Sequence, residues 1–168
     1  MTKPLPKDFD IRYSERSDLQ ALEVWFADPK EREPFPFEDD AETAGSLKNW
    51  IGFSKYKASL TGIVGNEICA VGTLFLMPYR KVSHHALFYL IVHPAWRRRG
   101  IGTSMVRNLM HLAQTRFHLE GLYAEIYDPN PIVPLLSKLN FELNVRQENF
   151  VQIGGRGHAR ILMGAFFK

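Results

Sequence analysis

The sequence has one cysteine, no long apolar run and little excess charge, and each shortage narrows the class of protein. Cys69 stands alone among 168 residues, so no disulfide framework can form within the chain, which is typical of a reducing compartment. The apolar runs are too short to span a membrane. The first ten residues, MTKPLPKDFD, lack the apolar segment of a secretory signal peptide. We therefore expect a cytoplasmic protein with no membrane partner.

Charge is only weakly biased. The formal net charge is +3, and the one basic cluster is Arg97, Arg98 and Arg99. Proteins that bind nucleic acid usually gather more positive charge on one face. We expect no nucleic-acid partner, although a nucleic-acid-binding module built on these arginines stays an alternative. Apolar residues make up 45% of the chain, which is enough for one domain with a core over residues 1–168.

Hydrophobic periodicity predicts alternating strands and helices. The strand patterns lie at 9–13, 57–64, 67–77, 84–92 and 121–128, with two more in 145–167 around the Gly154-Gly155-Arg156-Gly157 turn, and the helix patterns at 19–27, 41–53, 101–117 and 130–141. The order β-α-α-β-β-β-α-β-α-β-β predicts a single-domain α/β fold with a mixed sheet flanked by helices. The strand at 84–92 is apolar on both faces, so we expect it to be central and covered on both sides.

One segment between the predicted helices has no regular pattern. Residues 28–40, DPKEREPFPFEDD, hold three prolines and many acids, which is typical of a loop. Phe35 and Phe37 are unusual in a solvated loop. They either cover the core or form a wall of a substrate site, because long loops in small domains tend to carry function.

The segment HPAWRRRGIGTSM, residues 93–105, follows the central strand and leads into a helix. The first N–H groups of a helix have no partner within it, and the helix dipole makes that end positive. Gly100 and Gly102 let main-chain N–H groups approach an oxygen closely, and Thr103 adds a hydroxyl donor. This pattern favours a pyrophosphate ligand. It is not a P-loop, because no Gly-Lys-Ser/Thr follows a spaced glycine. It is not a dinucleotide fingerprint either, since Met105 stands where the third glycine would be.

The stretch LIVHPAWRRRGIGTSMV resembles motif A of the GNAT superfamily, the GCN5-related N-acetyltransferases, with Arg97, Gly100 and Gly102 at the three defining places. The predicted element order is similar to that fold across nearly the whole chain. The last segment, RQENFVQIGGRGHARILM, resembles the ribosomal-protein and spermidine acetyltransferases more loosely. The resemblance implies a GNAT-like fold and an enzyme, an acetyl-CoA-dependent N-acyltransferase that uses acetyl-CoA as co-substrate.

The resemblance also implies where acetyl-CoA binds. In the family, the fourth strand separates from the fifth, and its end pairs with the pantetheine arm, which corresponds here to Leu90, Ile91 and Val92. The side chains of the arginine cluster, Arg97 included, would face the 3′-phosphate or solvent. The N–H groups of six consecutive residues would hold the pyrophosphate, namely Arg98, Arg99, Gly100, Ile101, Gly102 and Thr103.

Acetyl transfer to an amine needs a base, an oxyanion donor and a tolerable leaving group. The stretch EIYDPN, residues 125–130, resembles the fifth strand of ribosomal-protein alanine acetyltransferases, which implies Glu125 as base and Asn130 as cofactor contact. Glu125 is otherwise an exposed strand residue, and Asn130 is otherwise a helix cap. Leu136 stands at the family's usual proton-donating tyrosine. Tyr127 is our candidate for that acid, with Tyr123 and Ser137 as alternatives.

The sequence says less about the amine acceptor than about the cofactor. The six acids Glu31, Glu33, Glu38, Asp39, Asp40 and Glu42 lie where family members shape the acceptor site, which favours a small cationic amine or a peptide N-terminus as substrate. We expect no metal, because His84 and His85 are adjacent in a strand and should point to opposite faces. A homodimer is expected from the family. Because Leu136 departs from the pattern, a degenerate acetyl-CoA-binding sensor is the alternative to an enzyme.

Overall fold

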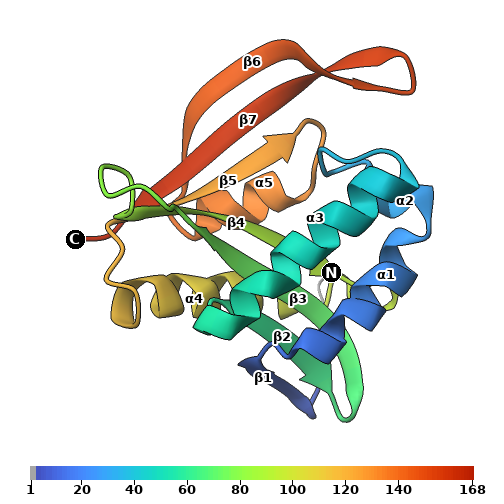
Figure 1. Cartoon of the computed structure of the whole chain (residues 1–168), viewed down its shortest axis with the longest axis vertical. Coiled ribbons are helices and arrows are strands. Elements are labelled where there is room, and N and C mark those ends of the chain that lie inside the picture. The colour runs from blue at the N-terminus through green and yellow to red at the C-terminus, as the bar shows by residue number, and fades with distance from the viewer. Residues whose placement is uncertain (1–2) are drawn as a thin grey trace.

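The computed structural model describes residues 3–168 and shows a mixed seven-stranded sheet with helices on both faces (Figure 1). Residues 1 and 2, which the single-domain prediction includes, lie outside the described part. The strand order is β1-β2-β3-β4-β5-β7-β6, and in the described sheet only β4 and β5 are parallel. The strands are β1 Phe9–Tyr13, β2 Ser59–Val64, β3 Glu67–Leu76, β4 His85–Val92, β5 Gly121–Tyr127, β6 Glu142–Ile153 and β7 Arg156–Phe166.

The helices occur in the predicted order, with one addition. The α-helices are α1 Leu19–Phe26, α2 Pro29–Arg32, α3 Asp40–Gly52, α4 Ile101–Thr115 and α5 Ile132–Lys138. The short α2 lies inside the predicted loop, where Asp28 caps it and Pro29 occupies its first position. The predicted α/β class with a mixed sheet flanked by helices is confirmed.

Helices α1 and α3 cover one half of the front face in Figure 1. Leu22 and Phe26 of α1 and Trp50 of α3 pack on Val71 of β3 and Ile91 of β4. Helices α4 and α5 cover the opposite face, where Met105 and Leu109 of α4 lie in the larger core. The face of β4 with Ala86 and Phe88 is buried in the larger core, whereas on the other face Ile91 is buried and His85, Leu87 and Tyr89 are only partly covered. The predicted central position is therefore confirmed, and the predicted cover on both sides is complete on one face only.

The two phenylalanines of the 28–40 segment lie against the first of these cores. Phe37 is 6% exposed, and the rings of Phe35 and Phe37 stack at 5.6 Å between centroids. Both rings meet Phe26 of α1 edge-on. The core-covering interpretation therefore holds. Phe35 also meets Tyr89 of β4 at 5.8 Å, so the same cover borders the centre of the sheet.

The structure also bears on two expectations from the sequence, the lack of a membrane-spanning segment and the role of the single cysteine. Among residues 3–168, no helix combines the length and apolarity needed to cross a membrane. Cys69 is fully buried in β3, and burial raises the pKa of its thiol to about 11. The thiol is therefore protonated at neutral pH and packs as a small apolar side chain.

Candidate functional site

The sheet opens between β4 and β5. The parallel pairing runs from His85 opposite Gly121 to Phe88 opposite Ala124 and then stops. Beyond this point β4 continues to Val92 while paired with β3, and β5 continues while paired with β7. The two central strands therefore diverge into a gap whose two edges carry unpaired main-chain groups.

The alternation of hydrogen bonds decides which groups face this gap. The His93 N–H donates to the Cys69 carbonyl at 2.9 Å, so in this antiparallel pair every second residue of β4 bonds to β3. The main-chain groups of Ile91 consequently face β3, and those of Leu90 and Val92 face the gap. The Val92 carbonyl accepts Arg97 Nε at 2.9 Å. Leu90 thus presents the strand-edge donor and acceptor that an extended ligand arm can pair with.

The turn that leads into α4 carries a row of N–H groups. Gly100 adopts φ +80°, a left-handed conformation that glycine takes without strain, and α4 begins at the next residue. Within residues 3–168, the main-chain N–H groups from Arg98 to Thr103 make no hydrogen bond, and the first helical bond runs from Ser104 N–H to the Gly100 carbonyl. These donors and the positive end of the helix dipole suit a phosphate group.

The three arginines of the cluster make different contacts. Arg97 forms an ion pair with Glu31 of α2 in addition to its bond to Val92. The guanidinium of Arg99 lies 5.1 Å from the ring centre of Trp96. The Arg98 carbonyl accepts the Lys3 N–H at 3.0 Å. Arg97 is therefore committed to the fold, and the three arginines do not act as one free basic patch.

Glu125 is the centre of a polar group in the gap. Arg160 Nε of β7 lies 3.1 Å from Glu125 Oε2. The Tyr127 and Tyr89 hydroxyls donate to Glu125 Oε1 at 3.1 and 3.4 Å. The register places Arg160 opposite Tyr127 and two residues along β5 from Glu125 on the same face. Three strands thus contribute side chains to one carboxylate.

The two tyrosines are strongly biased toward the protonated form. Burial, then the charge of Glu125, raises the pKa of Tyr127 well above its ordinary value. The same causes in the same order raise the pKa of Tyr89. Both hydroxyls therefore stay protonated at neutral pH, and each donates its hydrogen bond to Glu125 Oε1. Tyr123, by contrast, packs edge-on against His85 and Phe166.

The other two predicted positions lie at and within α5. Asn130 Oδ1 accepts the Ile132 N–H at 3.0 Å, so this side chain caps the start of α5. Leu136 is fully buried in the core beneath the sheet. The residue at the family's usual tyrosine place therefore belongs to the packing of α5 and presents no polar group to the gap.

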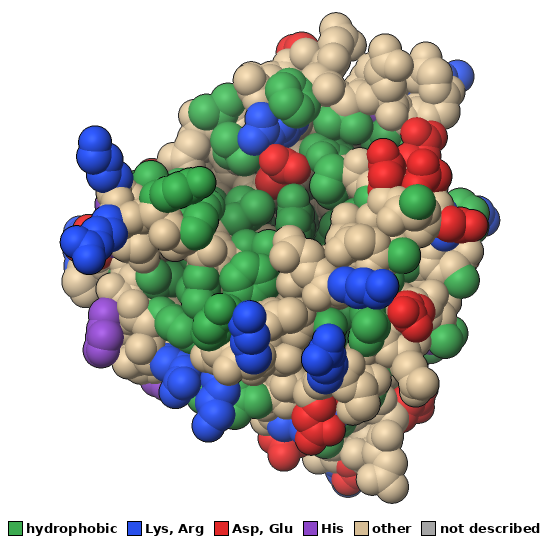
Figure 2. Space-filling view, in the orientation of Figure 1, with side chains coloured by type: hydrophobic (Ala, Val, Ile, Leu, Met, Phe, Trp, Pro, Cys, Tyr) green, Lys and Arg blue, Asp and Glu red, His purple; other side chains and the backbone are tan. Residues whose placement is uncertain are grey.

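The front of the gap opens onto a hollow between α3 and the β6–β7 hairpin, with a largely apolar surface and adjacent acidic and basic side chains (Figure 2). A small cavity of about 220 Å³ lies beside Tyr127 and is bordered by Glu33 of the α2–α3 loop and His158 of β7. Of the six acids in residues 31–42, Glu31 and Asp40 pair with arginines, and Asp39 and Glu42 accept main-chain N–H groups.

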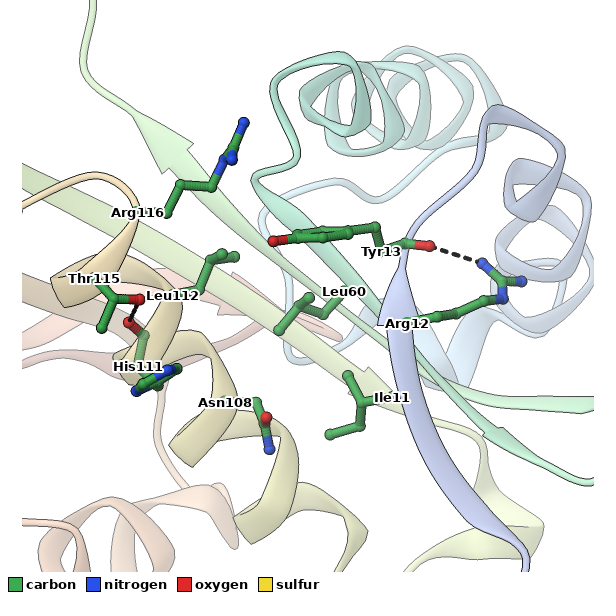
Figure 3. Close-up of a pocket in the computed structure, with 9 residues that line it drawn as sticks. All are labelled: Ile11, Arg12, Tyr13, Leu60, Asn108, His111, Leu112, Thr115 and Arg116. Carbon is green, nitrogen blue, oxygen red and sulfur yellow. Dashed lines mark hydrogen bonds between the residues drawn. The ribbon is translucent and has the colours of Figure 1, made fainter.

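A larger cavity of about 510 Å³ lies away from Glu125, between β1 and the C-terminal half of α4 (Figure 3). Leu60 and Leu112 lie at its base, and Tyr13 and Arg116 lie at its margin. Arg12 borders it but is paired with Asp18 at 2.8 Å. None of the predicted catalytic or cofactor-contacting residues lines this cavity.

The histidine pair differs from the geometry expected of it. The rings of His84 and His85 lie 3.8 Å apart between centroids, because β4 begins only at His85 and His84 is outside the pleated strand. The expectation that these two side chains point to opposite faces is therefore wrong. Among residues 3–168, no group of three or more His, Cys, Asp or Glu side chains is placed to hold a metal ion.

Of the residues that contact Glu125, the sequence predicted Tyr127 but not Tyr89 or Arg160. Strand alternation puts Tyr89 on the same face of β4 as Leu87, which lies opposite Tyr123 of β5. The sequence therefore contained a signal that could have placed Tyr89 on the face of Glu125. Arg160 had none, because only the pairing of β5 with β7 brings the last strand beside Glu125. Phe150 and Gln147 of β6 contact Arg160 in turn, and bulges in β6 had to be known to place them.

Comparison with known proteins gives one family and many similar structures. The model of the "Acetyltransferase (GNAT) family" matches residues 19–141. Among curated proteins, none matches the sequence. The structure of yncA from Salmonella typhimurium with its cofactor acetyl-CoA is 15% identical, with a TM-score of 0.82 over 95% of this chain and 94% of that one.

Two further structures have a comparable likeness. The ribosomal-protein-alanine N-acetyltransferase from Brucella melitensis is 20% identical, with a TM-score of 0.78 over 94% of this chain and 99% of that one. A GNAT-family acetyltransferase from Streptococcus pneumoniae is 17% identical, with a TM-score of 0.79 over 95% and 99% of the two chains. At these identities the likeness is one of fold.

Proposed function

This chain belongs to the acetyltransferase (GNAT) family, and we propose that it moves an acetyl group from acetyl-CoA directly to a primary amine. The observation that carries the proposal is the position of Glu125, a carboxylate on β5 at the gap between β4 and β5, bonded by two tyrosine hydroxyls. A carboxylate in this position can take a proton from an amine that enters the hollow.

Two features of the chain fit acetyl-CoA. The N–H groups from Arg98 to Thr103, for which residues 3–168 offer no acceptor, would hold the pyrophosphate at the start of α4. The outward main-chain groups of Leu90 and Val92 would pair with the amide-bearing arm, as an added strand does. Asn130, at the far side of the gap, would contact the same arm. Acetyl-CoA, when bound, supplies an acetyl group activated as a thioester.

The side chains then divide the proton transfers. An alkyl amine with a pKa near that of lysine, about 10.4, is mostly protonated at neutral pH, so Glu125 accepts its proton directly or through water. An N–H of β4 that faces the gap donates to the carbonyl oxygen as negative charge develops there. Tyr127, whose hydroxyl lies 3.1 Å from Glu125 Oε1, passes its proton to the departing sulfur as the newly protonated Glu125 returns one to the phenol oxygen.

The test is acetyl transfer by wild type and Glu125→Gln. Release of free thiol from acetyl-CoA is followed with a panel of primary amines, including polyamines, amino acids and short peptides with free N-termini. We expect Glu125→Gln to lower kcat/KM by about a hundredfold to ten-thousandfold, the usual contribution of a general base, with acetyl-CoA affinity unchanged. Glu148→Gln is the control, because that carboxylate is 66% exposed and pairs with Arg146 on the hairpin.

Leu136 favours one second candidate, a protein that binds acetyl-CoA without transferring the acetyl group. The residue is buried in the core and cannot donate a proton. Binding of acetyl-CoA with no thiol release for any amine would support this candidate. Equal activity of wild type and Glu125→Gln would show instead that another group is the base.

A further inference from the structure

A guanidinium lies beside the carboxylate that we propose as base, so an acceptor at Glu125 meets both charges. Arg160 Nε is 3.1 Å from Glu125 Oε2, yet it is buried and its N–H makes no aligned hydrogen bond. Nη1 donates to Gln147 Oε1 at 3.1 Å. Among residues 3–168 no acceptor bonds to Nη2. The guanidinium therefore keeps donors that the fold itself does not use.

The β6–β7 hairpin holds this guanidinium in place. The Phe150 ring lies 4.6 Å from Arg160 Cζ, a cation–π contact from the neighbouring strand. The Arg160 side chain is still 24% exposed, so a ligand in the hollow can reach it. An arginine that is oriented, partly desolvated and not fully bonded is well suited to bind a carboxylate.

We infer that Arg160 selects an acceptor that carries a carboxylate next to its amine, as an α-amino acid does. The inference rests on the proposed function and names its substrate class. The ammonium of such an acceptor would lie against Glu125 and its carboxylate against the Nη groups of Arg160. Because the two protein charges are only 3.1 Å apart, they match charges on adjacent atoms of the ligand better than charges at the ends of a long chain.

The surroundings of the site agree with this class. A polyamine would need excess negative charge, but four of the six acids in residues 31–42 already accept ion pairs or main-chain N–H groups, and Arg160 would repel it. The same face of the sheet carries Leu87, Tyr123 and Leu162 beside the charged pair. These side chains offer an apolar floor, so an amino acid with an apolar side chain is the best match.

The test compares amines that differ only in the carboxylate. The kcat/KM of acetyl transfer is measured for L-phenylalanine against L-phenylalaninamide and for L-leucine against L-leucinamide. We expect wild type to favour each acid by about tenfold or more, the size of a charge-assisted pair. This preference opposes intrinsic reactivity, since the amine of the amide is the weaker base and is less often protonated at neutral pH.

The variant Arg160→Gln isolates the contribution of the guanidinium. The acid-to-amide ratio of kcat/KM should fall to one or below, where intrinsic reactivity sets it, through a higher KM for the acids. A general loss caused by the altered Glu125 cancels in this ratio. Arg156→Gln, an exposed arginine at the start of the same strand, should keep the wild-type ratio. In the presence of CoA, calorimetry should show L-phenylalanine binding to wild type and much weaker binding to Arg160→Gln.

The outcomes separate this inference from the proposed function. If amines are acetylated but acids and amides react equally well, or Arg160→Gln keeps the preference, the inference is wrong and acetyl transfer stands. If L-phenylalanine binds in an Arg160-dependent way but no acetyl group is transferred, the site for the carboxylate stands and the proposed reaction is wrong. If no amine reacts and none binds, both are wrong.

Discussion

At the scale of single residues, the polar group around Glu125 combines a charged pair with two protonated tyrosines. The carboxylate receives hydroxyl donors from Tyr89 and Tyr127 and lies beside Arg160. Its partners come from β4, β5 and β7, so the group exists only when the sheet is assembled. This dependence explains why the sequence pointed to Glu125 and Tyr127 separately but gave no sign of Arg160.

Tyr127→Phe tests the role of the hydroxyl in catalysis. We expect kcat to fall by about tenfold, less than a typical general acid contributes, because a thiol with a pKa of about 8.5 leaves tolerably well unaided. Thiol release at saturating acetyl-CoA measures the effect. Tyr79→Phe, whose ring is 76% exposed, should match wild type. An unchanged kcat for Tyr127→Phe would assign the proton to another donor or to water.

The raised pKa values of Tyr89 and Tyr127 also predict a loss of stability in alkali. Above about pH 10, the unfolded chain releases phenolic protons that the folded chain retains. The folded state then binds more protons, so the free energy of unfolding falls as pH rises. Urea unfolding at about pH 8 and about pH 11 should show this fall in wild type and a smaller fall in Tyr127→Phe. Equal falls would contradict the raised pKa of Tyr127.

At the scale of elements, the turn before α4 and the connection between β1 and α1 (residues 14–18) differ in whether their polar groups are bonded within the fold. Among residues 3–168 nothing accepts the N–H groups of the turn from Arg98 to Thr103, an arrangement that fits a ligand. The polar groups of the β1–α1 connection, by contrast, bond to one another and stabilise the fold. Asp18 is 2% exposed and accepts from Arg12, the Glu15 N–H and Thr61, and so links β1, β2 and α1.

Gly100→Ala tests the turn, with Gly154→Ala as a matched control. Both glycines have positive φ, +80° and +57°, so each alanine should cost about 1–2 kcal/mol of stability. Only Gly100→Ala should also weaken acetyl-CoA binding, measured by calorimetry, because the shifted backbone re-aims the N–H groups. Equal acetyl-CoA affinity in both variants would contradict a binding role for the turn.

Asp18→Asn tests the β1–α1 connection. Burial opposes ionisation of Asp18, but hydrogen bonds from Arg12, the Glu15 N–H and Thr61 outweigh it and lower its pKa. Its contribution is therefore present above the unfolded pKa of about 3.9 and is lost as pH falls through the folded value. We expect Asp18→Asn to reduce the free energy of unfolding by about 3 kcal/mol at neutral pH. Exposed Asp8→Asn should change little, and a similar effect of both would contradict the account.

At the scale of the whole molecule, the sequence predicted what depends on local pattern. Strand alternation, the helix periodicity of 101–117 and the left-handed Asn140 at φ +65° were all readable along the chain. The gap between β4 and β5 was expected only from the family resemblance, because nothing in either strand says where pairing stops. The partners of Glu125 and of the six acids in residues 31–42 depend on strand register and long-range contacts, which a single sequence does not reveal.

The arginine cluster illustrates the same limit. In the sequence, Arg97, Arg98 and Arg99 form a basic run, which is why a nucleic-acid-binding module remained an alternative. In the structure Arg97 pairs with Glu31 and Arg99 stacks on Trp96. A chain that used these residues to bind phosphate backbones would need them exposed together. Their separate partners therefore weaken that alternative.

Thermal unfolding with acetyl-CoA, CoA and ATP tests most directly whether acetyl-CoA binds at the gap and the α4 turn. A ligand at a hundred times its Kd adds about 2.7 kcal/mol of stability, an easily measured rise in Tm. We predict that acetyl-CoA and CoA both raise the Tm and that ATP does not, because ATP has no arm to pair with Leu90 and Val92. No shift at millimolar acetyl-CoA, or an equal shift with ATP, would contradict the account.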